Sequence, residues 1–575
     1  MKKVFRKSIT LGVSAIMCAT MTFGFTGCSL YEQEGEAVDA TKTQLHVSNY
    51  NGGWGTEWLY NAKERFEDMF ADYQFEDGKT GVQIHVNPNR NDVNTTIRSS
   101  TDNIFFSGDI RINDLITQGL VADISDIVTD ETLADVSDGK ETGKIADKMY
   151  DSDKASLTGV DGKYYALPHN RSFAGLTYDA KLFTDKRYYL KANADGSWNG
   201  STNNAGFTNV KADKTVGPNG IRGDYDDGLP STLAEQIALF NRIAAVGDEP
   251  LIWPGRHTWY VTHLSTALWA SLAGPDGVRS AFDFGSTGTN EQNTIEVVTG
   301  FDGDTPITEN KRITPATGYL TTQTSARYYA TKQMYDILSN SDKYLSKKWT
   351  GVLCHTETQY EYVYSDLESA KTGHSIAMLV DGNWWYNEAS DSFKSSVDRF
   401  KEDAENRNFK IMPMPWKVDG GVKEGEGKAP TLVADNTDLC VIKAANTKGG
   451  VLDAAKKFIK FLYTDAECVE FETTTGTPKG VKYEMSPEKY NGMNVYYKSV
   501  HDLVKAANVV TSASGHPIYV NNQSDFSPLR TYVIGSGNSD FPYSQFINKE
   551  TTAKGWFEGM NRESTWASKY EDYIS

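Results

Sequence analysis

Aromatic side chains beside expected turns carry the most specific chemistry in this sequence. An indole or phenol ring presents an electron-rich face, which suits the apolar C–H face of a sugar ring. Sugar hydroxyls in turn suit the planar polar groups of Asp, Asn and Arg. The aromatic residues just beyond expected strands or next to Gly and Pro are Trp54, Trp253, Trp259, Tyr260, Trp384, Trp385 and Tyr386. The polar companions are Asn51, Asp109, Asn170, Arg171, Asp381 and Asn383.

These residues predict a surface that binds a small neutral carbohydrate. For each tryptophan the alternative is an ordinary place in the hydrophobic core. Trp384 and Trp385 are adjacent after the turn Asp381-Gly382, and neighbouring side chains on an extended chain point to opposite sides. At least one of the pair should therefore face an opening or a neighbouring loop. The ligand-binding candidates are Asn51, Trp54, Asp109, Trp253, Trp259, Asp381, Trp384 and Trp385.

Catalytic and metal-binding patterns are weak. No phosphate-binding loop, dinucleotide glycine fingerprint or serine nucleophile elbow occurs, and no acidic pair stands out as a glycosidase dyad. His257 and His263 are six residues apart, which is not the spacing of a helical zinc motif. The acidic run at 224–227 offers clustered oxygens to calcium but lacks the regular ligand spacing, so a solvated turn is the alternative. We expect no catalytic residue, cofactor or metal.

The elements that would position the candidates begin with a strand–helix–strand unit. Residues 44–48 and 82–86 alternate between apolar and polar, and apolar residues spaced three and four apart at 59–73 predict a helix between them. Such a unit implies a parallel sheet, and a third short strand follows at 104–106. Ligands bind beyond the carboxyl ends of parallel strands, which places residues 51–54 and 107–109 at that rim.

Further elements are expected along the chain. Thr232 and Glu235 form a capping box that starts a helix. An apolar stripe predicts another helix at 452–462, and residues 375–380 predict a buried strand closed by the turn at 381–382. Residues 195–228 are rich in Gly, Asn, Asp and Ser without periodicity, which indicates a loop or an insertion.

The first 27 residues resemble an export signal. Four cationic residues precede an uncharged, largely apolar stretch at 8–25, and Thr26-Gly27-Cys28 then resembles the bacterial lipobox, although Phe25 stands where that pattern prefers Leu. The resemblance implies cleavage before Cys28 and a diacylglycerol on its thiol, whose two lipid tails give stable anchoring to the outer face of the plasma membrane. Residues 28–42 then form a flexible tether. An ordinary signal peptide is the alternative.

Composition limits the classes of function. About 535 residues remain after the tether, which exceeds one core and predicts at least two lobes. The formal net charge of -18 argues against nucleic acid or a basic face on anionic lipid. Cys354, Cys440 and Cys468 are an odd set without paired spacing, so no disulfide framework is expected, and the last two should be buried.

Five segments, in order, resemble the extracellular solute-binding proteins of carbohydrate ABC importers, the class of maltose-binding protein. Residues 48–55 (SNYNGGWG) resemble the first strand and its ligand loop, and residues 229–232 (LPST) precede a helix that the family usually starts with a tryptophan. The other three segments are 161–183, which contains DGKYYALP and GLTYDAKLF, 373–384 (GHSIAMLVDGNW) and 455–471.

The resemblance implies a two-lobed α/β fold, each lobe a mixed or parallel sheet flanked by helices, with a hinge between the lobes. Lobe 1 would comprise residues 43–168 and 433–478, and lobe 2 residues 169–432 and 479–575. By position, Trp384 matches the family's sugar-stacking tryptophan and Tyr178 its cleft tyrosine. Asp109 lies near a hydroxyl-binding aspartate of the first lobe.

The implied function is a non-catalytic receptor that binds an oligosaccharide between the lobes and delivers it to ABC permease subunits. We expect a monomer. Two alternatives stay open at this point: a surface enzyme acting on polysaccharide, and a glycan-capture protein without a transporter.

Overall fold

Alternating apolar residues form the first strand, β1 (Thr43–Asn49), in the computed structural model of the chain. Leu45 and Val47 are fully buried, and β2 (Val82–Asn87) and β3 (Ile104–Ser107) pair with β1 in parallel. Helix α2 (Glu57–Met69) connects β1 to β2, as the sequence predicts. The structure describes residues 37–575 except 90–91, 109, 160, 258, 286–292, 349–352, 368–374, 435–437, 513–514, 517, 520–525, 527–542 and 561–562.

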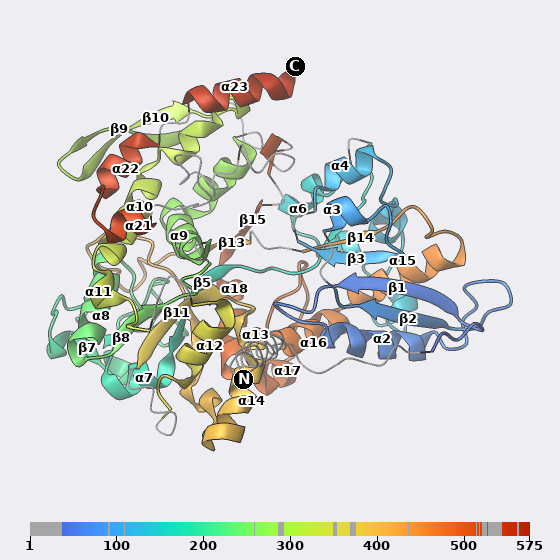
Figure 1. Cartoon of the computed structure of the whole chain (residues 1–575), viewed down its shortest axis with the longest axis horizontal. Coiled ribbons are helices and arrows are strands. Elements are labelled where there is room, and N and C mark those ends of the chain that lie inside the picture. Colours follow the sequence, from blue (N-terminus) through green and yellow to red (C-terminus); the bar gives the residue numbers. More distant parts are fainter. Residues whose placement is uncertain are drawn as a thin grey trace, which may run out of the picture. The chain divides into compact units, whose positions relative to one another are not determined.

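Two distant segments complete the first sheet. β14 (Leu439–Ile442) lies antiparallel to β3, and β4 (Leu167–Pro168) pairs with β14. The strand order is β2-β1-β3-β14-β4. Helices α2 and α15 (Gly450–Leu462) lie beside this sheet (Figure 1). They contribute Phe66 and Phe458 to its core.

The second sheet has the order β12-β5-β11-β8. Its strands are β5 (Ala174–Asp179), β8 (Glu249–Ile252), β11 (Ile376–Gly382) and β12 (Phe409–Met412). β11 is buried along its whole length because helices cover both faces. Met378 packs in a core with α8 (Leu233–Val246) and α9 (Trp259–Asp283), whereas Leu379 packs with α12 (His355–Tyr364) and α18 (Val495–Ala506).

The chain passes between the two sheets three times. It leaves the first sheet after β4, returns between β13 (Thr431–Ala434) and β14, and leaves again after α16 (Asp465–Thr475). One core gathers buried residues from 45–167 and 439–481, while the cores of the second sheet draw on 173–433 and 493–566. The predicted α/β class with two mixed sheets flanked by helices is thus confirmed; the lobe boundaries remain a prediction.

Several local predictions can be compared directly with the structure. The capping box forms, since the Thr232 hydroxyl accepts from the Glu235 N–H and the Glu235 carboxylate accepts from the Thr232 N–H. Cys440 and Cys468 are buried, as predicted. The predicted strand at 375–380 continues further, because Asp381 and Gly382 stay in register with Gly175 and Ala174 of β5.

The segment 195–228 is mostly irregular, as expected, but it folds closely onto the second sheet's core. The short strands β6 (Tyr189–Leu190) and β7 (Phe207–Thr208) pair, and Phe207 and Val216 are buried. The remaining elements are α3 (Val93–Thr96), α4 (Ile112–Thr117), α5 (Ile145–Lys148), α6 (Asp151–Ser156), α7 (Ala180–Lys186), β9 (Thr294–Asp302), β10 (Thr305–Arg312), α10 (Ser325–Leu338), α11 (Ser341–Tyr344), α13 (Trp385–Glu388), α14 (Ser390–Ser395), α17 (Pro487–Gly492), β15 (Asn508–Thr511), α21 (Tyr543–Ile547), α22 (Ala553–Gly559) and α23 (Glu563–Ile574).

The predicted signal and Cys28 lie outside the described residues. Within the described part of the chain, no helix combines the length and apolar character that crossing a membrane requires.

Candidate functional site

The loop after β1 is clasped by helix α13, which follows β11. The Gly53 N–H donates to Glu388 Oε1 at 2.7 Å, and Asn387 Nδ2 donates to the Gly53 carbonyl at 2.9 Å. Gly53 has a φ of +61°, a conformation that glycine adopts without strain. β1 and β11 are central strands of the two sheets, and the segments that follow their carboxyl ends are therefore joined by two hydrogen bonds. We call this pair of bonds the clasp.

Hydrogen bonds to residues near the first sheet also hold the clasped loop. The Asn51 N–H donates to the Pro88 carbonyl at 3.0 Å, and Asn51 Oδ1 accepts from the Thr56 hydroxyl at 3.1 Å. Asn49 Nδ2 closes the loop by donating to the Gly55 carbonyl at 3.1 Å. Trp54 is half-buried and packs against the core of the first sheet. Two candidates from the sequence, Asn51 and Trp54, thus belong to a loop with a defined shape.

The adjacent tryptophans differ in surroundings. Trp384 is 9% exposed, and its ring lies so close over Gly382 that a Cβ added there would be 2.2 Å away. The His263 ring meets that of Trp384 edge-on, with centroids 6.1 Å apart. Trp385 is fully buried in the core against Tyr362, Phe409 and Tyr496. Trp384 has the backbone of a helix start rather than a strand, so the expected extended geometry does not apply.

A charged cluster lies behind the clasp. His355 Nε2, at the start of α12, is 3.1 Å from Asp381 Oδ2 and 3.4 Å from Glu388 Oε2. Burial opposes the charged imidazolium, but the carboxylates of Glu388 and Asp381 outweigh it and raise the pKa of His355 to about 9. Burial, with Asp381 nearby, also raises the pKa of Glu388, although His355 and the Gly53 N–H favour its carboxylate. The charged histidine therefore holds two partly desolvated carboxylates in place.

Two rings of α9 continue this surface. The Tyr260 ring lies 5.5 Å from that of His355 and 5.3 Å from that of His263. Burial lowers the pKa of His263 to about 4, so its imidazole is neutral near pH 7. A pocket beside His263, lined also by Phe173, Met412 and Leu432, has a volume of about 20 Å³. That volume accommodates one water and no sugar ring.

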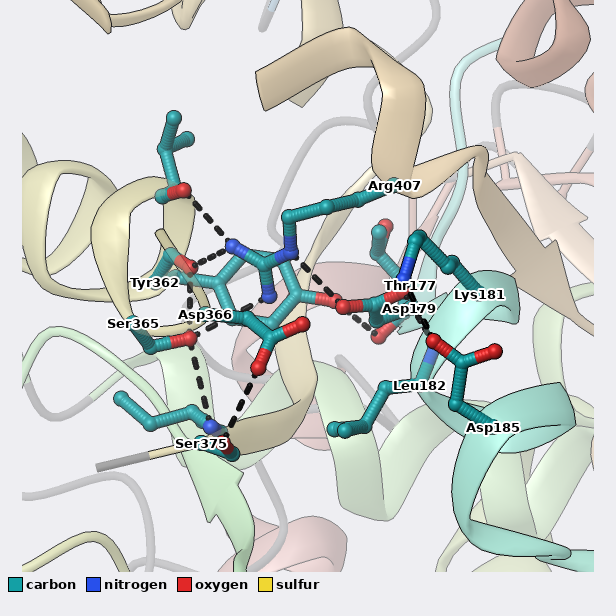
Figure 2. A network of polar contacts seen from close by, with 12 residues as sticks. Thr177, Asp179, Lys181, Leu182, Asp185, Tyr362, Ser365, Asp366, Ser375 and Arg407 are labelled. Carbon is teal, nitrogen blue, oxygen red and sulfur yellow. Dashed lines mark hydrogen bonds and ion pairs between the residues drawn. The ribbon is translucent and has the colours of Figure 1, made fainter. Parts of the chain in front are cut away.

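Figure 2 shows a buried polar network around Arg407, at the end of the helix α12 that begins with His355. Arg407 Nε donates to Asp179 Oδ2 at 2.7 Å, and Arg407 Nη1 donates to the Tyr362 and Val363 carbonyls at 2.7 and 2.6 Å. Asp179 Oδ1 accepts from the Leu182 N–H at 2.9 Å, which caps α7. Both charged side chains are at most 3% exposed. The last turn of α12 is thereby tied to the end of β5.

The other candidates lie apart from the clasp or outside the described residues. Trp253 is 1% exposed in the core of the second sheet. Tyr178 is 2% exposed on β5, in ring contact with Phe183, and lines a different pocket. Asp381 is buried and contacts His355. Asp109 and the side chain of Trp259 are outside the described residues.

The polar companions from the sequence have structural partners. Arg171 forms a buried ion pair with Asp153 at 2.9 Å, and Asn383 Oδ1 accepts from the Phe173 N–H at 3.1 Å. In the described residues, no three His, Cys, Asp or Glu side chains are grouped as a metal ion would require. In the acidic turn, Asp226 Oδ2 accepts from the Asn219 N–H and Asp227 Oδ2 from the Gly223 N–H.

Sequence reasoning missed Asn387, Glu388 and His355. Glu388 follows Trp384 by four residues, a helical spacing that places both on one side of α13. This spacing could have identified Glu388 as a neighbour of Trp384 from the sequence. His355 carries no comparable mark, because it is one of nine histidines scattered along the chain.

Comparison with known proteins identifies the fold. No protein-family model matches the chain, and no curated protein matches it either. Among solved structures, a chitin oligosaccharide binding protein aligns with a TM-score of 0.52 at 15% identity, covering 92% of this chain and 98% of that one. RafE from Streptococcus pneumoniae aligns with a TM-score of 0.52 at 11% identity, over 93% of this chain and 99% of its own.

Two further structures agree with these. RafE in complex with raffinose has a TM-score of 0.50 at 12% identity, and it covers 92% of this chain and 99% of its own. A probable secreted solute-binding lipoprotein from Streptomyces coelicolor gives the same TM-score of 0.50 and identity of 12%, over 92% and 99%. The chain therefore has the fold of solute-binding proteins along nearly its whole length.

Proposed function

We propose that the chain is a non-catalytic receptor that binds an oligosaccharide between the loop after β1 and helix α13. The observation that carries this proposal is the clasp between Gly53 and α13, beside Trp384. It joins the carboxyl ends of strands from two sheets, where α/β proteins bind ligands. The fold is shared with proteins that bind chitin oligosaccharide and raffinose.

Binding would replace the clasp rather than add to it. Gly53 and α13 are in direct hydrogen-bond contact, so the loop and α13 must separate to admit a sugar between them. Separation frees the Gly53 N–H, the Asn387 amide and the Glu388 carboxylate, which are the kinds of groups that hydrogen-bond sugar hydroxyls. Trp384 would then supply an apolar face for stacking. Hinge closure on the sugar would exchange protein–protein hydrogen bonds for protein–ligand ones.

We assign the binding candidates two different roles. Asn51 and Trp54 on the clasped loop, with Trp384 on the other side, are proposed to contact ligand. Asp381 is proposed to act through His355, because it is buried behind that residue. Asp109 and Trp259 stay predicted contacts. Trp253, Trp385 and Tyr178 are proposed to support the fold, since each is at most 2% exposed.

The cellular setting follows from the same proposal. The segment 28–42 would tether the receptor outside the plasma membrane through a lipid on Cys28, close to ABC permease subunits that accept its sugar. The proposed lobes are residues 43–168 with 433–478 and residues 169–432 with 479–575. A monomer suffices for this role, because each chain carries both sides of the clasp.

A polysaccharide-active enzyme is the alternative with an observation in its favour. Asp381 and Glu388 are two carboxylates that contact the same histidine. A glycosidase needs both carboxyl groups to face the scissile bond. Asp381 is 1% exposed and lies behind His355, which favours the receptor.

A thermal-shift screen of the mature chain against an oligosaccharide library tests the proposal. A bound sugar at 100 times its dissociation constant should add about 2.7 kcal/mol to the free energy of unfolding. In the same incubations, new reducing ends should not accumulate. Stabilisation by no soluble oligosaccharide would contradict the receptor, and sustained release of reducing ends would favour the enzyme. Binding to polymeric glycan alone would favour the glycan-capture protein.

A further inference from the structure

A second pocket lies on the far side of Tyr178, away from the clasp. It has a volume of about 360 Å³ and is formed where the segment 195–228 folds onto β5 and β12. Small-molecule sites in proteins start at about 300 Å³. Its lining includes three lysines from two segments: Lys211, Lys214 and Lys410. Two carboxylates, Asp224 and Asp227, also line it, so the ammonium groups are in excess.

In the described part of the chain, the lysines of this pocket form no ion pair. Among the described residues, no Asp or Glu oxygen lies within ion-pair distance of Lys211, Lys214 or Lys410, whereas the nearby Lys191 pairs with Asp213 at 3.3 Å. Lys214 and Lys410 are half-buried. The Lys214 ammonium lies over the Tyr189 ring, 3.1 Å from its centroid. Half-buried like charges that lie close together destabilise the folded chain unless a counter-ion binds between them.

The lowered pKa of Lys214 shows that its positive charge is destabilised in this pocket. Burial, with Lys410 and Lys211 adding repulsion, lowers the pKa of Lys214 to about 8, and Asp227 only partly offsets it. Burial, with Lys211 nearby, also lowers the pKa of Lys410, which Asp502 partly offsets. Asp227 is a weak counter-charge, because burial raises its own pKa.

The pocket also contains a buried hydroxyl that can donate to a ligand. The Tyr225 hydroxyl is buried, the Asn219 side chain acts on its oxygen, and no acceptor for its proton lies within hydrogen-bond distance among the described residues. Burying a hydroxyl donor without an acceptor destabilises the folded chain. An acceptor oxygen from a ligand would satisfy it, together with the ammonium groups, which can only donate.

We propose that this pocket binds a phosphate group, free or as the ester of a small molecule, between Lys214 and Lys410. Lysine binds phosphate as a point charge, and separate point charges suit a tetrahedral dianion better than a planar carboxylate, which favours the fork of arginine. Lys211 adds a third charge at the mouth, and the Tyr225 hydroxyl donates to a phosphate oxygen. This site is independent of the proposed sugar site at the clasp.

Isothermal titration of the mature chain with inorganic phosphate, and separately with glucose 1-phosphate, tests the proposal. The wild type should bind saturably, and Lys214→Gln and Lys410→Gln should each weaken binding by about tenfold or more. Lys423→Gln, which removes the same charge from an exposed lysine paired with Asp195, should leave binding unchanged. Tighter binding of the ester would identify it as the natural form, whereas glucuronate should bind weakly.

The proton uptake that accompanies binding distinguishes a phosphate site at Lys214 from nonspecific charge effects. Near pH 8 Lys214 is partly neutral, so a dianion should draw a proton onto it, and the observed heat should differ between Hepes and Tris buffers. The difference should vanish in Lys214→Gln and also in Lys214→Arg, whose guanidinium is already protonated. Phosphate binding itself should persist in Lys214→Arg, which keeps the charge and shows whether loss of fold explains the Gln result. The proposal is overturned if the wild type shows no saturable binding, or if both Gln variants bind like the wild type.

Discussion

Replacing Glu388 by Ala should loosen the loop after β1 while leaving both sheets intact. The substitution removes the acceptor of the 2.7 Å hydrogen bond from the Gly53 N–H. A hydrogen bond to a charged group contributes about 1.5–3 kcal/mol. The closed clasp should therefore open more often by roughly 10- to 150-fold. The remaining bond, from Asn387 to the Gly53 carbonyl, is between neutral groups and is weaker.

Amide hydrogen exchange of the peptide covering residues 50–56 measures this opening directly. Its protection should fall by the same factor in Glu388→Ala, while peptides from β1 and β11 exchange as in the wild type. Glu57→Ala is the matched control, because it removes an exposed carboxylate beside the same loop without touching the clasp. Equal protection of the loop in both variants would show that the clasp does not hold it, and the proposed opening step would have to be abandoned.

Three further predictions concern stability. The pKa of His355 is raised to about 9 in the folded chain, so the stability that the charged histidine contributes is complete below about pH 6.5 and is lost as the pH rises through 9. Between these pH values the urea midpoint of His355→Gln should therefore vary less than that of the wild type. Parallel curves of midpoint against pH would contradict the assignment. Arg407→Met leaves Asp179 buried and unpaired and should cost about 3–5 kcal/mol in chemical unfolding. Lys181→Met, which breaks an exposed pair with Asp185, should cost at most about 1 kcal/mol, and similar losses in the two variants would refute the role of the network. Trp385→Ala should cost about 3–5 kcal/mol because the indole is fully buried; a loss below 1 kcal/mol would place it outside the core.

Elements with strong local patterns could be predicted from the sequence. β1, β2 and β3 alternate or are continuously apolar, α2 and α15 carry stripes at helical spacing, and Thr232 with Glu235 marks the start of α8. In each case the information lies within a few neighbouring residues. β11 was predicted too short, because Asp381 looks like a turn residue and is kept in the strand by pairing with β5.

The candidate site was only partly predictable, because its residues meet through tertiary contacts. Gly53 and Glu388 are 335 residues apart, and nothing local to either indicates the other. A turn-side tryptophan can face a cleft or the core, and only the packing of helices around β11 places Trp385 inside and Trp384 beside the clasped loop. Tyr178 matches the position of the family's cleft tyrosine in the order of the sequence segments. Its ring nevertheless packs against Phe183 and lines the second pocket.

The most direct test of the account is the dissociation constant of the best oligosaccharide for the wild type and for Trp384→Ala, measured by isothermal titration. Burying an aromatic side chain against a ligand contributes about 1.5–3 kcal/mol, so the variant should bind roughly 10- to 150-fold more weakly. Trp198→Ala, in the segment 195–228, should bind like the wild type. Equal affinity of Trp384→Ala and the wild type would contradict sugar binding at the junction of the loop after β1 and α13.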